Sequence, residues 1–469
     1  MNHYTRHFGR LAALVLLLGS TACISTRGVG PAYERPESPL PEAFGEAQGA
    51  AAERRADWWS AFDDASLEAL VLAVRENNRE LRAGLARLNQ ARALVGAART
   101  EGMPQIAVEP SFQRARTSDR LEVFPGVTAG RTANTTTLPF TLGWELDLFG
   151  RIQHSIEAAQ ADMDIAEADF DALLLLLETE AASTYLSMRT IDLELSVVAR
   201  SVETFRESAA LIRRRFDLGA VSELDVARAD SLLASREADQ FALQRARTTA
   251  QYALAVLVGE TATGFQVESA PLAGQPPSVP PGLPSELLLA RPDLRRSERR
   301  LAAENARVGV ATAAFYPSLS LTGSAGWQAT DASDLFDTDA KTWAIRPQLY
   351  MPLFQGGRNQ ANLDRSRARY EEVVEDYQNS VLIALSEVES ALATQRFLGS
   401  QSAAQQRAVV AALRARDVSM TQYEVGTADF LDVLDAERTA LDAQRSEARL
   451  RGEAFLNTVQ LLRSLGGRW

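Results

Sequence analysis

Cysteine and histidine are almost absent from this sequence of 469 residues. Cys23 is the one cysteine, and His154 is the one histidine beyond the first ten residues. A single cysteine excludes both a disulfide framework and a zinc site built from several thiolates. The sequence also lacks a Gly-Xaa-Ser-Xaa-Gly elbow, a phosphate-binding loop and a cysteine–histidine pair. We therefore expect no metal site, no cofactor and no enzymatic activity.

Positive charge is in deficit, with 49 Lys+Arg against 61 Asp+Glu and a formal net charge of -12. Binding to nucleic acid without regard to sequence requires a basic face, so no nucleic-acid partner is expected. The hydrophobic content of 46% and the charged content of 23% are typical of folded protein and exclude a disordered chain.

Proline is missing from two long stretches, residues 140–270 and 353–469. Because proline inside a helix costs about 3 kcal/mol, both stretches are free to form very long helices. Between them, Pro271–Pro292 contains seven prolines, which is typical of a linker or an irregular crossing.

The N-terminal residues indicate a targeting signal. Two arginines precede the apolar run Leu11–Leu18, and Gly19–Ala22 leads directly to Cys23. This order predicts a secretory signal; the alternative is a retained membrane anchor, for which the run is too short. The segment resembles a bacterial lipoprotein signal, in which the cysteine carries a covalent lipid. Ile24 is not the aspartate of inner-membrane retention, so the resemblance implies a lipid anchor on Cys23 in the outer membrane of a Gram-negative cell.

One long unit occurs twice in the sequence. The segment Phe216–Val226 recurs as Tyr423–Val433, with each matched residue 207 positions later. Two further matches keep the same offset: Gly150-Arg151 with Gly357-Arg358, and Val258-Gly259 with Leu465-Gly466. We infer a tandem duplication.

Apolar residues recur with a helical period in both copies. The first copy predicts a helix over Arg151–Phe216, a turn at Gly219 and a return helix from Ser222 to about Leu257. At ~1.5 Å per residue the longer helix extends ~100 Å. The second copy predicts the same pair from Arg358 to Leu465, with Gly426 in the turn. Taken alone, such helices favour a soluble coiled coil.

Each copy also contains two runs in which apolar residues alternate with small or polar ones. The runs cover residues 105–116 and 136–149 in the first copy, and 317–328 and 342–354 in the second. This alternation is typical of transmembrane barrel strands of ~10 residues, and the alternative is a pair of half-buried soluble hairpins. Behind a lipoprotein signal we favour the barrel, with surface loops at roughly 117–133 and 329–340.

Four strands are too few to close a barrel, which needs about eight. Unpaired strand edges in lipid cost several kcal/mol per group, so the barrel must be shared between copies of the chain. Two copies would give eight strands with a lumen filled by side chains. Three would give twelve strands and an open conduit, so we expect a cyclic homotrimer whose long helices form a periplasmic tunnel.

Five segments resemble one family of proteins. They are Val29–Pro36, Trp58–Phe62, Arg291–Leu294, Phe315–Gly323 and Leu465–Trp469, and they are similar to OprM/NodT-type outer-membrane efflux lipoproteins. The resemblance covers essentially the whole mature chain. It implies the TolC-like fold, which is mainly α with a shared twelve-stranded transmembrane β-barrel and a long helical tunnel. It also implies the outer-membrane channel of a tripartite efflux pump for drugs or other small toxic compounds, with a periplasmic adaptor and an inner-membrane RND transporter as partners.

The same resemblance divides the chain into five parts. We expect a signal peptide at 1–22, a lipid anchor and N-terminal equatorial segment at 23–65, a first repeat at 66–260, a Pro-rich crossing at 261–284, and a second repeat at 285–469 with a C-terminal equatorial segment.

Two kinds of site follow at the helix turns, which lie far from the strands and so form the periplasmic mouth. The resemblance implies that the turns bind the adaptor. The predicted docking residues are Gly219, Ala220, Val221, Gly426, Thr427 and Ala428.

The segment after the second turn resembles the part of the family that closes the mouth. Asp432 and Asp435 share a helix face, and Arg438 is spaced to pair with Asp435. Repeated around a trimer axis, these groups would narrow the pore and attract cations. The predicted gate residues are Asp432, Asp435, Arg438, Tyr423 and Asp225; a solvated helix face is the alternative.

Two other functions remain open on the same fold, namely the exit duct for type I protein secretion and metal-ion efflux. The lipoprotein signal favours drug efflux, and six methionines without clustering disfavour dedicated copper or silver export.

Overall fold

The computed structural model describes residues 28–36, 40–46, 57–118, 120, 122–124, 127–128, 130, 132–280, 282 and 284–467. The predicted signal peptide, Cys23 and the last two residues lie outside them. The described chain forms two compact units. The first unit takes its residues from Met1–Pro36, Leu88–Ala166 and Ser297–Tyr377, and the second from Glu37–Arg87, Glu167–Arg296 and Gln378–Trp469.

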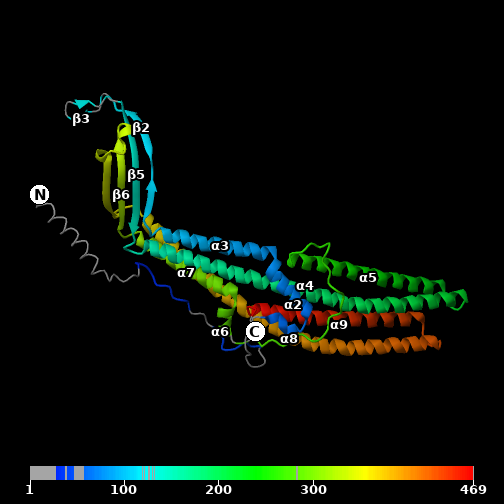
Figure 1. Cartoon of the computed structure of the whole chain (residues 1–469). Coiled ribbons are helices and arrows are strands. Elements are labelled where there is room, and N and C mark those ends of the chain that lie inside the picture. Colours follow the sequence, from blue (N-terminus) through cyan, green and yellow to red (C-terminus); the bar gives the residue numbers. More distant parts are fainter. Residues whose placement is uncertain are drawn as a thin grey trace. The chain divides into compact units, whose positions relative to one another are not determined.

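An antiparallel sheet lies in the first unit (Figure 1). β1 and β2 both pair with β5, β5 pairs with β6, and β6 pairs with β7. The strand is interrupted between β1 and β2 at Pro110, which has no N–H to donate to a neighbouring strand. β1 and β2 therefore lie end to end along β5. The sheet is therefore four strands wide, as predicted. The bounds are β1 (Gln105–Val108), β2 (Ser111–Arg116), β5 (Thr132–Leu146), β6 (Ser318–Ala329) and β7 (Lys341–Tyr350).

Strand ends and loops differ from the prediction in four places. β5 begins at Thr132, four residues earlier than expected, because its N-terminal part pairs with all of β2. β7 ends at Tyr350, before Pro352. The first predicted loop contains a ribbon of β3 (Glu122–Phe124) and β4 (Val127–Thr128), and the second contains the short 3-10 helices η2 and η3. The bounds of the latter are Ala332–Asp334 and Thr338–Ala340.

Both outer edges of this sheet are open. β7 is exposed at every residue, and so are β1 and β2. Within the part of the chain that the structure describes, each of these edge strands pairs on one side only. The central pair has a long continuous register, from Thr136 opposite Ala329 to Leu146 opposite Leu319.

Two helical hairpins repeat with the same lengths. α4 (Arg151–Asp217) and α8 (Arg358–Glu424) each have 67 residues. α5 (Glu223–Leu257) and α9 (Phe430–Ser464) each have 35 residues. Every one of these helix bounds recurs 207 positions later, so the predicted tandem repeat is confirmed.

Shorter helices complete the chain. Asn78 separates α2 from α3: its side-chain amide donates to the carbonyl of Leu257, and its side-chain oxygen accepts from the N–H of Leu81. Among the described residues, no helix combines the length and hydropathy needed to cross a membrane. The bounds are η1 (Trp58–Phe62), α2 (Ala65–Asn77), α3 (Arg79–Thr100), α6 (Pro284–Ala290) and α7 (Pro292–Ala313).

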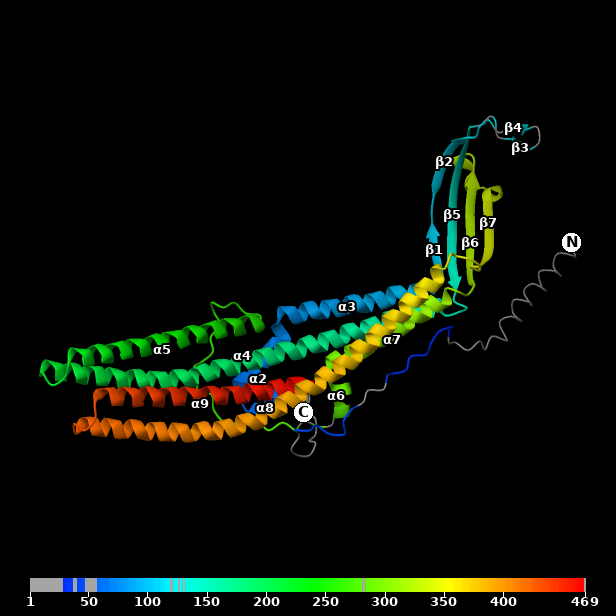
Figure 2. The ribbon, with the colours of Figure 1, turned by 180° about the vertical axis from the view of Figure 1, so that it is seen from behind.

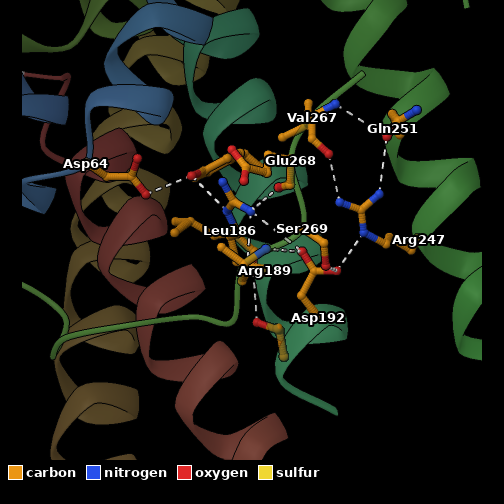
Figure 3. Close-up of polar contacts among 12 residues, drawn as sticks. Asp64, Leu186, Arg189, Asp192, Arg247, Gln251, Val267, Glu268 and Ser269 are labelled. Carbon is orange, nitrogen blue, oxygen red and sulfur yellow. Dashed lines mark hydrogen bonds and ion pairs between the residues drawn. The ribbon is translucent and has the colours of Figure 1, made fainter. Parts of the chain in front are cut away.

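A buried polar network fixes the Pro-rich crossing to α4 and α5 in the second unit (Figure 3). The Asp192 side chain is 1% exposed, and its Oδ1 accepts from Arg247 Nε at 2.6 Å and from Ser269 Oγ at 3.0 Å. Arg189 Nη1 donates to the main-chain carbonyl of Glu268 at 2.6 Å. Because buried charges are stable only when paired and hydrogen-bonded, this network determines the path of the crossing over the first hairpin.

The corresponding groove of the second hairpin is hollow. The position equivalent to Asp192 is Gly399, and the position equivalent to Arg247 is Ala454. Both line a cavity of about 500 Å³ between α8, α9 and the crossing. Small residues in place of an aspartate and an arginine therefore leave this groove of the second copy open. In the first copy the side chains of Asp192 and Arg247 occupy the same place.

Candidate gate and docking site at the helix turns

The turn between α4 and α5 and the turn between α8 and α9 have the same backbone geometry. Both lie at the same end of the second unit (Figure 2). The Ala220 N–H donates to the Arg215 carbonyl at 2.8 Å, and the Thr427 N–H donates to the Gln422 carbonyl at 2.9 Å. These bonds satisfy carbonyls that a helix end would otherwise leave free.

A glycine makes each turn possible. Gly219 has φ of 73° and Gly426 has φ of 80°, a left-handed conformation that costs other residues about 1–2 kcal/mol. An added Cβ would meet nothing within 4 Å at either position, so the backbone there is open to a partner. Of the six predicted docking residues, Gly219, Ala220, Gly426 and Thr427 are exposed, and Val221 and Ala428 are partly buried.

Sequence reasoning missed two exposed apolar side chains beside these glycines. Leu218 is 83% exposed and Val425 is 69% exposed. They occupy equivalent positions in the two copies of the repeat, so the comparison of the two copies in the sequence could have identified them. A docking surface at the turns would therefore be apolar as well as glycine-rich.

Asp225 and Asp432 are the third helical residues of two helix capping boxes, whose N-cap residues are Ser222 and Asp429. The Ser222 N–H donates to Asp225 Oδ2 at 3.0 Å, and the Asp429 N–H donates to Asp432 Oδ2 at 3.2 Å. Both form capping boxes. The Ser222 hydroxyl also donates to Asp225 Oδ2 at 2.7 Å, and this hydrogen bond is the main reason that the pKa of Asp225 is lowered from its ordinary value. Each carboxylate thus has a local structural role, and the gate role of both residues stays a prediction.

Asp435 and Arg438 form the ion pair that their spacing predicted. Arg438 Nη2 lies 3.0 Å from Asp435 Oδ1, and both side chains are exposed. Exposed pairs of this kind contribute about 0–1 kcal/mol. Both groups are therefore available to contacts with another chain, which a gate shared between subunits requires.

Tyr423 is buried rather than exposed at the mouth. Its ring lies 5.4 Å from the Phe430 ring, and the Arg215 guanidinium lies 4.7 Å from the ring centre. Tyr423 belongs to an apolar cluster, here called the tip cluster, that joins all four long helices. Its members are Phe205, Ala209, Ile212, Ala229, Tyr423, Phe430, Val433 and Leu434. Because this cluster connects the two hairpins, a change in their spacing must repack it.

The other predicted site residue, Cys23, lies outside the described residues, so its lipid attachment stays a prediction. Among the residues that the structure describes, no group of three or more histidine, cysteine, aspartate or glutamate side chains is placed to hold a metal ion.

Long paired helices and a narrow open-edged sheet define the TolC-like class of outer-membrane channel. The sequence profile of the family described as "Outer membrane efflux protein" matches residues 70–260 and 283–467. The chain is 32% identical to outer membrane protein OprJ of Pseudomonas aeruginosa over 98% of this chain and 96% of that protein. It is 30% identical to the cation efflux system protein CusC of Escherichia coli over 98% of this chain and 99% of that protein.

The fold matches solved structures equally well. The outer-membrane channel OprN superposes with a TM-score of 0.87 at 33% identity, covering 94% of this chain and 99% of that one. The chain belongs to the outer membrane efflux protein family, and it is an outer-membrane protein with the TolC-like fold.

Proposed function

We propose that this protein is the outer-membrane channel of a tripartite RND-type efflux pump that exports drugs or other small toxic compounds. The open sheet edges carry the proposal. A sheet with unpaired N–H and C=O groups along both edges is stable in lipid only if other chains pair with them.

Three copies complete the structure best. Each contributes a sheet four strands wide, so a ring of three gives twelve strands and a lumen wide enough for solutes. A ring of two gives eight, and side chains fill a barrel of that size. The homotrimer therefore follows from the proposed conduit.

The helix turns are the proposed contact with a periplasmic adaptor, which would link the channel to an inner-membrane transporter. Two equivalent turns per chain give six in a trimer, each presenting a glycine with open backbone and an exposed aliphatic side chain. The proposed gate lies just behind them, at Asp432, Asp435 and Arg438. Cargo crosses the channel without bond chemistry, so we propose no enzymatic activity and no cofactor beyond a lipid on Cys23.

Deletion of the gene tests this function. The deletion strain should become more sensitive to a panel of drugs, detergents and dyes, and the wild-type gene should restore resistance. Co-purification of an adaptor and an RND transporter with the tagged channel identifies the pump. Unchanged sensitivity across the panel, with no such partner recovered, would contradict the proposal.

Metal-ion efflux is a second candidate, because CusC matches along nearly its whole length and is named as a cation efflux protein. Copper and silver salts therefore belong in the same panel. Selective sensitivity to these salts would favour the second candidate, and a peptide-exporting ATPase gene beside this one would favour type I secretion.

A further inference from the structure

Glu437 is a largely buried acidic residue next to the proposed gate. It is 8% exposed and lies on α9 between two apolar clusters. On one side, Val433 and Leu434 belong to the tip cluster. On the other side, Leu441 packs with Val198 of α4 in a second cluster. The carboxylate therefore lies where α9 contacts the rest of the helical unit.

No described residue donates a hydrogen bond to Glu437 or forms an ion pair with it. From α8, the charges that act on it are those of Arg416 and Asp417. Arg416 Nε and Nη2 both donate to Asp417 Oδ1, at 2.9 and 2.7 Å, so its charge is already matched. Three ion pairs lie among the charged groups of α4, α5 and α9 near the tips: Arg213 with Asp230, Arg206 with Glu203 and Glu237, and Arg438 with Asp435.

The first copy shows what the missing partner would be. The residue equivalent to Glu437 is Asp230, which forms an ion pair with Arg213. The residue equivalent to Arg213 is Met420, which packs against the tip cluster. The second copy therefore keeps the acid and buries it, but replaces its cation with an apolar side chain.

We propose that Glu437 is a proton switch for the mouth of the channel: the packed arrangement of the tips holds Glu437 protonated, and ionisation of Glu437 loosens α9 from the neighbouring helices. The proposal deepens the proposed gate and rests on it. The proton is exchanged with water of the periplasm, so no other reactant is needed.

The direction of the switch follows from burial. Burial raises the pKa of Glu437 above its ordinary value of 4.5; Arg416 opposes this and Asp417 adds to it. Because the pKa is higher in the packed state, that state binds the proton more tightly and is stabilised at low pH. The stabilisation is lost as pH rises through the raised pKa. Acidification should therefore close the mouth.

Conductance of purified trimers in planar lipid bilayers tests the switch between about pH 7.5 and about pH 5, a range that lies just above the ordinary pKa of a glutamate. Wild-type conductance should be lower at the acidic pH than at the neutral one. Glu437→Gln should hold conductance low at both pH values, because the amide mimics the protonated acid. Met420→Arg supplies the cation of the first copy, so the ionised carboxylate is compensated in the packed state and conductance should stay low at both pH values.

Asp230→Asn is the matched control, and it should leave the pH response of the wild type intact. A wild-type conductance that does not change with pH, or a Glu437→Gln variant that still responds, would overturn the proposal. Met420→Arg keeps the test decisive if the glutamine variant fails to fold.

Hydrogen exchange separates this inference from the proposed function. Amides of residues 430–441 in the purified protein should exchange more slowly at about pH 5 than the intrinsic pH dependence of exchange accounts for, and Glu437→Gln should remove that difference. If hydrogen exchange of these amides changes with pH only as the intrinsic rate does, the switch is refuted, even if the protein conducts ions. If the expected slowing is seen but the protein conducts no ions at any pH, the proposed channel function is refuted instead.

Discussion

The two copies of the repeat share their helix bounds and differ in how their polar side chains are used. In the first copy, Asp192 and Arg247 hold the crossing in the groove between α4 and α5. In the second, Gly399 and Ala454 leave a cavity of about 500 Å³ at the same place. Helix lengths, caps and turn glycines were kept because they determine the backbone, whereas side-chain pairs were free to diverge.

The same difference appears at the tips. Asp230 is paired with Arg213 in the first copy, and Glu437 is unpaired and buried in the second. At this position the first hairpin is held by a charge pair, while the second packs apolar side chains around an acid that has no cationic partner. A moving part requires a low barrier between two arrangements, so the second hairpin is the better candidate for the part that moves.

The largest expected effect is that of Asp192→Ala. Removing this carboxylate leaves the buried Arg189 and the partly buried Arg247 without their acidic partner, which costs about 3–5 kcal/mol. Thermal unfolding of the purified protein measures the loss. Gly399→Ala is the control at the equivalent position, where an added Cβ meets nothing within 4 Å; it should be neutral or stabilise by up to about 1 kcal/mol. A cost below about 1 kcal/mol for Asp192→Ala would show that other contacts hold the crossing.

Gly219→Ala and Gly426→Ala should have equal effects. Both glycines have left-handed φ and open surroundings, so each substitution should cost about 1–2 kcal/mol through backbone strain alone. Hydrogen exchange at the adjoining helix ends reports the loosening. Unequal effects would mean that the turns differ in more than their side chains.

Asp225→Asn and Asp432→Asn remove the carboxylate from the two capping boxes. Each should cost about 1 kcal/mol in helix stability. Because the pKa of Asp225 is lowered in the folded chain, its contribution is complete above the pKa of the unfolded chain and is lost as pH falls through the folded pKa. Stability measured against pH should therefore show a smaller acid loss in Asp225→Asn than in the wild type. Curves that coincide would indicate that the cap contributes nothing.

The smallest effect on stability belongs to Asp435→Asn and Arg438→Ala, at about 0–1 kcal/mol for an exposed pair. Their effect on conductance should be larger, because closure of the proposed gate depends on these two charges, whereas the stability of the fold does not. Both variants should raise ion conductance or drug leak through purified trimers. Unchanged conductance in both would remove this pair from the gate.

Local rules made much of this structure predictable. The starts at Arg151 and Arg358, the turns at Gly219 and Gly426 and the cap at Ser222 all follow from backbone preferences that act within a few residues. The strand positions followed from alternation in the same way. Asp225 and Asp432 also match the capping pattern, so their role as caps was readable without a structure.

Long-range packing decided the rest. No local pattern shows that Tyr423 packs with Phe205, that Glu437 is buried without a partner, or that one groove is filled and the other is hollow. These outcomes depend on which helix faces meet, and therefore on residues far apart in the chain. The sequence determined the helices, the turns and the duplication, because hydrogen bonding and φ preferences are local; the tertiary structure alone decided which charges found partners, because desolvation depends on everything packed around them.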